Sequence, residues 1–187
     1  YYNKPSQEGL YRHFAMVAEA SPLPIVLYNI PGRTGVNILP ETVIRIAADY
    51  DNVVAIKEAS GSLQQVERII EMAPDGFDVI SGDDAIAIEV MLLGGSGLIS
   101  ATGNAFAEEM GELVHAALQS RYDAALDIHR NLGEIFRLAF AEGNPAGVKC
   151  MMHHRGLCNN VLRLPLVPVS TALDKDISAV MKTLGTT

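Results

Sequence analysis

The sequence predicts an α/β protein in which helices cover a parallel β-sheet. Four short runs rich in β-branched residues predict buried strands, at residues 24–29, 53–58, 78–83 and 97–102. Segments with helical periodicity lie between these runs, so strand and helix alternate along the first part of the chain. Near-continuous apolar strands joined by helices are typical of parallel sheets. The alternation by itself fits either a closed barrel or an open sheet.

The helices are predicted from their period and from start signals. Pro40 stands at a first helical position, and Ser62 with Gln65 three residues later predicts an N-cap. Asp83 and Asp84 open another helix, where carboxylates cap free amides, and we prefer this role to a metal role. Helical periodicity covers 8–20, 40–50, 62–73 and 84–94, and after residue 102 it covers 107–120, 122–140, 144–156 and 172–184. The last four segments predict a helical appendage.

Composition excludes several classes of protein. Of 187 residues, 49% are hydrophobic and 19% charged, as in an ordinary soluble globular protein. The formal net charge of −8 argues against a nucleic-acid or anionic-membrane partner, because either would require a basic face. Membrane insertion is not expected, since Glu89 and several glycines interrupt the longest apolar stretch. Two cysteines make no disulfide framework and suit a reducing cytosol, so we expect a cytoplasmic protein.

Three weaker motifs have plain structural explanations. In "CMMHHRGLC" only Cys150, His154 and Cys158 share a face of a predicted helix, so we expect a core-facing helix with His153 and His154 at its margin, and no metal site. "GGSG" at 94–97 precedes a strand and no lysine follows it, so a turn is expected rather than a phosphate loop. Five methionines in helical segments are expected to fill the core: Met72, Met91, Met110, Met151 and Met152.

Lys57 ends an apolar run, "VVAIKEAS", where an ammonium group would be costly to bury. A lysine that reaches solvent from the strand end, or that pairs with Glu58, is the ordinary explanation. Tyr28 favours another one, because it ends a neighbouring predicted strand. A lysine in an apolar pocket loses its proton more easily, and the neutral amine can attack a carbonyl to form a Schiff base. A phenol beside it could transfer the protons that this reaction requires.

The motifs "YNIPGRTG" and "VVAIKEAS" resemble the signature of the dihydrodipicolinate synthase and N-acetylneuraminate lyase family. The resemblance extends to the opening "YYNKPSQEGLY", to "SGDD" and "GGSGLIS", and to the late "NPAGVK" and "LRLPLVPV". It implies a (β/α)8 TIM barrel whose strand-six lysine forms an imine with a 2-keto acid, usually pyruvate, without a further cofactor. In that case Lys57 is the nucleophile and Tyr28 the proton shuttle.

The resemblance also implies roles for other residues. Arg33 matches the synthase branch, in which a guanidinium binds the carboxylate of aspartate semialdehyde. Tyr2 resembles a tyrosine that completes the proton relay of a neighbouring subunit. Gly82 and Ile99 are expected to line the keto-acid pocket through their backbones, and Tyr1 to lie near the site where lysine inhibits some members. The partners expected are therefore pyruvate, aspartate semialdehyde and further copies of the chain, as a dimer of dimers.

The implied function is the condensation of pyruvate with aspartate semialdehyde in lysine biosynthesis, by the diaminopimelate route. Two alternatives stay open: an aldolase or lyase of the same family that acts on N-acetylneuraminate or a 2-keto-3-deoxy sugar acid, and a non-catalytic fragment that acts only in assembly. Residues 1–3 resemble the end of a fourth barrel strand. We therefore expect residues 1–118 to form the second half of the barrel, from the end of strand four through strand eight, and residues 119–187 the C-terminal helical region.

Overall fold

The structure is a computed structural model that describes residues 3–185. The chain divides into two compact units between Ile99 and Ser100. We call residues 3–99 the sheet unit and residues 100–185 the helical unit, and each is described by itself. No helix among the described residues is both long enough and apolar enough to cross a membrane.

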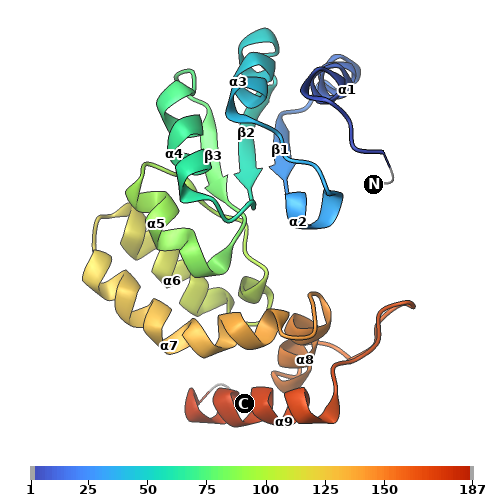
Figure 1. Ribbon diagram of the computed structural model, residues 1–187. Coiled ribbons are helices and arrows are strands. Elements are labelled where there is room, and N and C mark those ends of the chain that lie inside the picture. Colours follow the sequence, from blue (N-terminus) through green and yellow to red (C-terminus); the bar gives the residue numbers. More distant parts are fainter. Residues whose placement is uncertain (1–2, 186–187) are drawn as a thin grey trace. The chain divides into compact units, whose positions relative to one another are not determined.

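The sheet unit contains a four-stranded parallel sheet, which confirms the predicted α/β class (Figure 1). Each strand pairs with the next one along the chain, in the order β1-β2-β3-β4. The strands are β1 (Ile25–Asn29), β2 (Val53–Glu58), β3 (Asp78–Ser81) and β4 (Gly97–Leu98). β4 is shorter than the predicted run to residue 102. After the backbone amide of Ile99 bonds to Ser81, β3 has ended and offers this strand no further partner.

Helices connect the strands and begin at the predicted signals. Ser62 accepts a hydrogen bond from the Gln65 amide at 3.2 Å, and Asp83 accepts one from the Ala85 amide at 2.9 Å. Pro40 opens its helix as predicted. The helices are α1 (Gln7–Ala20), α2 (Pro31–Thr34), α3 (Pro40–Asp49), α4 (Leu63–Met72) and α5 (Ala87–Leu92), the last preceded by a 3-10 turn, η1 (Asp84–Ile86). The four-residue helix α2 was not predicted, because it is too short to show a period.

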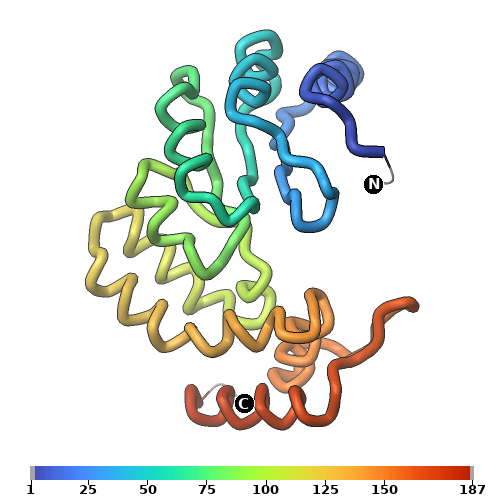
Figure 2. Tube along the Cα trace, in the orientation of Figure 1, coloured from blue at the N-terminus to red at the C-terminus, as the bar shows by residue number. Residues whose placement is uncertain are grey.

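The two faces of the sheet differ within the sheet unit. Leu27, Ile56 and Val79, which pair with one another across β1, β2 and β3, are buried in one hydrophobic core together with apolar residues of α1, α3, α4 and α5. On the other face Val26 and Tyr28 are each 45% exposed. We call these the helix-covered face and the open face. The path of the chain through the strands and their connecting helices can be followed in Figure 2.

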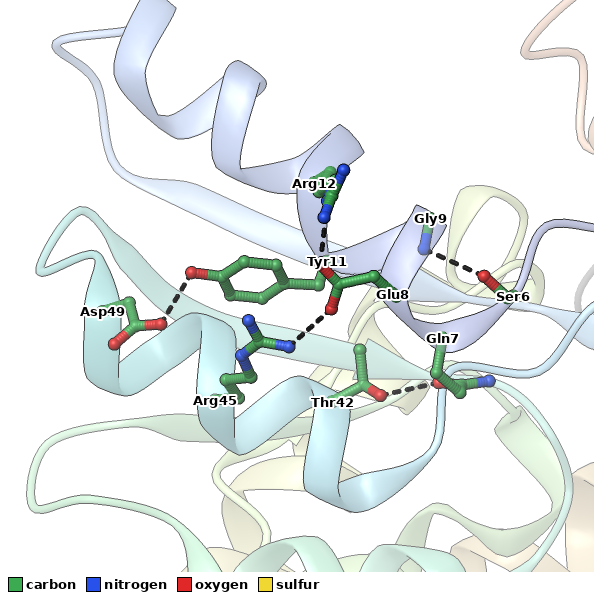
Figure 3. A network of polar contacts seen from close by, with 9 residues as sticks. All are labelled: Ser6, Gln7, Glu8, Gly9, Tyr11, Arg12, Thr42, Arg45 and Asp49. Atoms are coloured by element: carbon green, nitrogen blue, oxygen red, sulfur yellow. Dashed lines mark hydrogen bonds and ion pairs between the residues drawn. The ribbon is translucent and has the colours of Figure 1, made fainter.

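Polar side chains join the outer surfaces of α1 and α3 (Figure 3). The guanidinium carbon of Arg45 lies 3.5 Å from the centre of the Tyr11 ring, and Arg45 also donates to Glu8 at 2.8 Å. Arg12 donates to the same carboxylate, and the Tyr11 hydroxyl donates to Asp49. These contacts are exposed to solvent, so they orient the two helices and add little to the free energy of unfolding.

The helical unit contains helices in all four segments where the period predicted them, and its role as an appendage to a barrel stays a prediction. It contains a 3-10 turn, η2 (Thr102–Asn104), and the helices α6 (Ala107–Leu118), α7 (Tyr122–Phe140), α8 (Ala146–His154) and α9 (Thr171–Thr183). Gly147 allows α8 to pack tightly on α7, because a side chain there would collide with the backbone carbonyl of Ala139. The predicted boundary at residue 118 stays a prediction.

Two details of the helical segments differ from expectation. α8 ends at His154, so Cys158 lies beyond the helix and not on its face. Gly156 follows the C-cap residue Arg155 and has a positive φ of 71°, a conformation that suits glycine and turns the chain. Of the methionines expected in the core, Met91, Met110 and Met151 are buried, whereas Met72 and Met152 are only partly buried.

Candidate active site

Lys57 and Tyr28 lie side by side on the open face of the sheet. They are direct partners in the parallel ladder between β1 and β2. Paired residues of neighbouring strands project to the same face, which brings the two side chains together. The Lys57 amine lies 4.3 Å from the centre of the Tyr28 ring. The two residues that the sequence separates by a whole helical connection therefore meet at the carboxyl edge of the sheet.

Lys57 does not pair with the neighbouring carboxylate. Glu58 points to the helix-covered face, as strand alternation requires, and is bound there by other groups. Within residues 3–185 Lys57 forms no ion pair. The ordinary explanation of a Lys57–Glu58 pair is therefore wrong, and the amine remains available on the open face.

The backbone of Gly82 lies close to the Lys57 side chain. A β-carbon at this position would lie 3.1 Å from Cε of Lys57 and 2.6 Å from the Ala59 side chain. The Gly82 amide donates to the Glu58 carbonyl at 2.7 Å, which extends the pairing of β2 and β3 by one residue. Glycine is needed here because the backbone approaches the lysine stem closely.

Ile99 and Arg33 lie on segments that follow strands β4 and β1. The Ile99 amide donates to the Ser81 carbonyl at 2.9 Å, so its backbone continues the edge that carries Gly82. Arg33 is exposed on α2, which begins two residues after β1 ends. Carboxyl ends of parallel strands are where α/β proteins place active sites. Five of the predicted site residues lie at or after such ends: Tyr28, Arg33, Lys57, Gly82 and Ile99. Tyr1 and Tyr2 lie outside the described residues.

A buried polar network lies on the helix-covered face directly behind Lys57. We call Asn29, Asn37, Glu58 and Gln65 the amide–carboxylate network. Glu58 is 2% exposed and accepts hydrogen bonds from Asn29 at 2.8 Å, Gln65 at 2.9 Å and the Ser60 amide at 2.6 Å. None of these donors carries a charge, so the carboxylate depends on complete hydrogen bonding for its stability.

The same network fixes the loop that carries Arg33. Asn29 donates to Asn37 at 2.7 Å and accepts from the Ile38 amide at 3.0 Å, so the two ends of the loop are tied together. Gln7 of α1 binds the loop from the other side, donating to the Asn37 carbonyl and accepting from the Leu39 amide. The sequence pattern indicated Glu58 only as a possible partner of Lys57 and Gln65 only as part of a helix start signal. It gave no sign that these two residues meet Asn29 and Asn37.

A surface hollow in the sheet unit lies elsewhere. It is lined by residues of α3 and α4, among them Pro40, Gln65 and Arg68. These helices cover the face of the sheet opposite to Lys57, so the hollow does not belong to the candidate active site. The amine, the phenol and the close backbone of Gly82 together suit imine chemistry on a small carbonyl compound.

Comparison with known proteins places these features in a family. The sequence model described as the dihydrodipicolinate synthetase family matches residues 1–184. The chain belongs to this family. The 4-hydroxy-tetrahydrodipicolinate synthase of Phocaeicola vulgatus is 51% identical over 184 residues, which make up 98% of this chain and 62% of that protein.

Solved structures of dihydrodipicolinate synthetase family members have the same fold. The dihydrodipicolinate synthase of Aquifex aeolicus matches with a TM-score of 0.97 and 38% identity, over all of this chain and 64% of that one. The chloride-inhibited enzyme of Acinetobacter baumannii, solved as a complex with pyruvate, matches with a TM-score of 0.95 and 38% identity, over all of this chain and 64% of that one. The chain thus spans less than two thirds of the length of these relatives.

Proposed function

We propose that this chain is the lysine-bearing part of a synthase that condenses pyruvate with aspartate semialdehyde on the diaminopimelate route to lysine. The observation that carries the proposal is the contact of Lys57 with Tyr28 on the open face, where the Lys57 amine lies 4.3 Å from the centre of the Tyr28 ring. Family membership and the relatives' names support the same reaction. No cofactor is needed, because the lysine itself activates the keto acid.

In the proposed reaction the Lys57 amine attacks the keto carbon of pyruvate and forms a carbinolamine. Loss of water gives a protonated imine, and loss of a methyl proton gives an enamine. The enamine carbon then attacks the aldehyde carbon of the second substrate. Tyr28 transfers protons to and from the oxygen that leaves as water, because its ring lies against the amine. Gly82 and Ile99 surround the keto acid through their backbones.

Arg33 is proposed to bind the carboxylate of aspartate semialdehyde. A guanidinium can form two parallel hydrogen bonds with a carboxylate, and α2 presents it beyond the end of β1. Tyr2 is proposed to complete the relay of a neighbouring subunit in a dimer of dimers, and Tyr1 to lie near a lysine-inhibitor site. Both tyrosines lie outside the described residues, so these two roles depend on the family resemblance alone.

We also propose that the sheet is the second half of a (β/α)8 barrel. Strand order that follows chain order, helices on one face and an open face with exposed Val26 and Tyr28 all suit such a half. We expect residues 1–187 expressed alone to self-associate and to be inactive, and the full-length protein to be active. A monodisperse and active 187-residue protein would contradict the half-barrel proposal.

The decisive test is reductive trapping in the full-length protein. Incubation with pyruvate and borohydride should add one reduced pyruvyl group to the peptide that contains Lys57. Lys57→Ala should abolish the label, and the control Lys149→Ala, on α8, should retain it. Label on another lysine would refute the assignment. A panel of aldehydes with pyruvate held constant then separates the semialdehyde synthase from a sugar-acid aldolase.

A further inference from the structure

Three side chains with metal-binding atoms meet between α8 and α9 of the helical unit. Cys150 and His154 lie one turn apart on α8, and Asp174 lies in the first turn of α9. One Asp174 oxygen, Oδ1, accepts from the Cys150 thiol at 3.1 Å and lies 2.7 Å from Nε2 of His154. Sulfur, nitrogen and oxygen atoms all lie within 4.8 Å of one another. Figure 1 shows the two helices that supply them.

The cluster is partly accessible to solvent through two of its three side chains. Cys150 is fully buried, whereas the side chain of His154 is 23% exposed and that of Asp174 45% exposed. An ion could therefore enter past the carboxylate, and a water molecule could complete its coordination. The arrangement of three protein ligands with an open fourth position is typical of zinc sites.

The two distances from Asp174 suit a small tetrahedral ion after a modest side-chain rotation, and the ligand atoms of Cys150 and His154 lie within 4.8 Å of each other. Zinc bonds of about 2.0–2.3 Å place neighbouring ligand atoms roughly 3.3–3.7 Å apart. The contacts of Asp174 with Cys150 and His154, at 3.1 and 2.7 Å, are shorter than this. The exposed Asp174 side chain must therefore withdraw by about half an ångström, within its torsional freedom. The i, i+4 spacing on α8 keeps the other two ligands on one side of the helix.

We propose that Cys150, His154 and Asp174 bind one zinc-like divalent cation that joins α9 to α8. A thiolate and an imidazole select borderline ions such as Zn²⁺ and Co²⁺ over Mg²⁺ or Ca²⁺, which prefer oxygen. Cys158, the third side chain that the sequence pattern places on this helix face, lies beyond the end of α8. Asp174, which lies far along the chain, takes the place of Cys158.

Without a cation the three groups form a hydrogen-bonded cluster. Burial and then the hydrogen bond to Asp174 raise the pKa of the Cys150 thiol to about 12. Binding of a cation releases the thiol proton to solvent as the metal–sulfur bond forms.

The test is a Co²⁺ titration of the full-length protein after removal of metal with a chelator. We expect one ion per chain, with a thiolate-to-cobalt charge-transfer band and the visible bands of tetrahedral cobalt, both removed by adding Zn²⁺. Cys150→Ser should lose the charge-transfer band. The matched control Cys158→Ser should keep it, because that thiol lies beyond α8.

A second variant distinguishes loss of metal binding from misfolding of the protein. His154→Gln changes a partly exposed side chain, and we expect it to lower the cobalt affinity at least about tenfold while the circular dichroism spectrum stays unchanged. Absence of the thiolate band in the wild type would overturn the proposal. So would a band that survives Cys150→Ser, or one that depends on Cys158 instead.

Discussion

Lys57 and Glu58 are neighbours in the sequence, yet they occupy opposite environments. Lys57 projects to the open face beside a half-exposed phenol and forms no ion pair within the described residues. Glu58 projects to the helix-covered face, where three neutral donors surround its carboxylate. The end of β2 therefore has two roles, one on each face of the sheet. One side chain is left available for reaction, and the next is fully bound and holds the surrounding loops in place.

Removal of the phenol should have the largest effect on the open face. Tyr28→Phe in the full-length protein should lower the rate of the proposed condensation by about 10²–10⁴-fold, because a positioned proton donor typically contributes that much. Thermal stability should hardly change, since the side chain is half exposed. Steady-state kinetics and a melting curve measure the two effects, and an unchanged rate would contradict the shuttle role.

A substitution at Gly82 tests whether the backbone there must lie close to the Lys57 side chain. Gly82→Ala would place a methyl group 2.6 Å from the Ala59 side chain and 3.1 Å from the Lys57 stem. We expect a loss of about 1–3 kcal/mol in the free energy of unfolding and slower trapping of pyruvate. Gly32→Ala is the matched control, because nothing lies within 4 Å of an added β-carbon there. Equal behaviour of the two variants in urea unfolding would refute the steric argument.

Glu58 should affect stability more than chemistry. Glu58→Gln replaces one acceptor oxygen by an NH₂ group, so at least one buried donor among Asn29, Gln65 and the Ser60 amide loses its acceptor. The expected loss is about 1–3 kcal/mol in the free energy of unfolding. Borohydride trapping at Lys57 should survive at temperatures where the variant is folded. Loss of trapping without loss of stability would show that the two faces are not separable.

The smallest effect is expected at Glu8, which is exposed in the polar contacts of Figure 3. Hydrogen bonds from Arg45 and then Arg12 hold the pKa of Glu8 below its ordinary 4.5. A lowered pKa in the folded state means that its stabilisation is present above about pH 4.5 and is lost as the pH falls further.

Glu8→Gln should therefore change the melting temperature slightly at pH 7 and not at all in strong acid. Added salt should shrink the difference at pH 7, because exposed charges are screened. Melting curves at the two pH values and two salt concentrations measure this. A larger effect than that of Glu58→Gln would invert the comparison between exposed and buried carboxylates.

Local patterns predicted most of the fold, since burial repeats every second residue in a strand and every third or fourth in a helix. Strands β1 to β4 each begin within a residue of their predicted starts, and Ser62 and Asp83 cap helices as expected. The length of β4 could not be predicted, because a strand ends where its partner ends. Local patterns also could not predict contacts between residues far apart in the sequence. Asn37 is linked to Glu58 by hydrogen bonds through Gln65, and Cys150 donates to Asp174, 24 positions further along the chain.

The register that pairs Tyr28 with Lys57 and Asn29 with Glu58 determines which side chains share a face of the sheet. A strand repeats every two residues, so the insertion of a single residue before Lys57 within β2 would exchange the two faces. The ammonium group would then lie among the amides of the core, and the carboxylate would face the phenol. Insertions in the connections on either side of β2 leave this register unchanged. Variation in length among relatives is therefore expected in those connections, and never inside the six residues of β2.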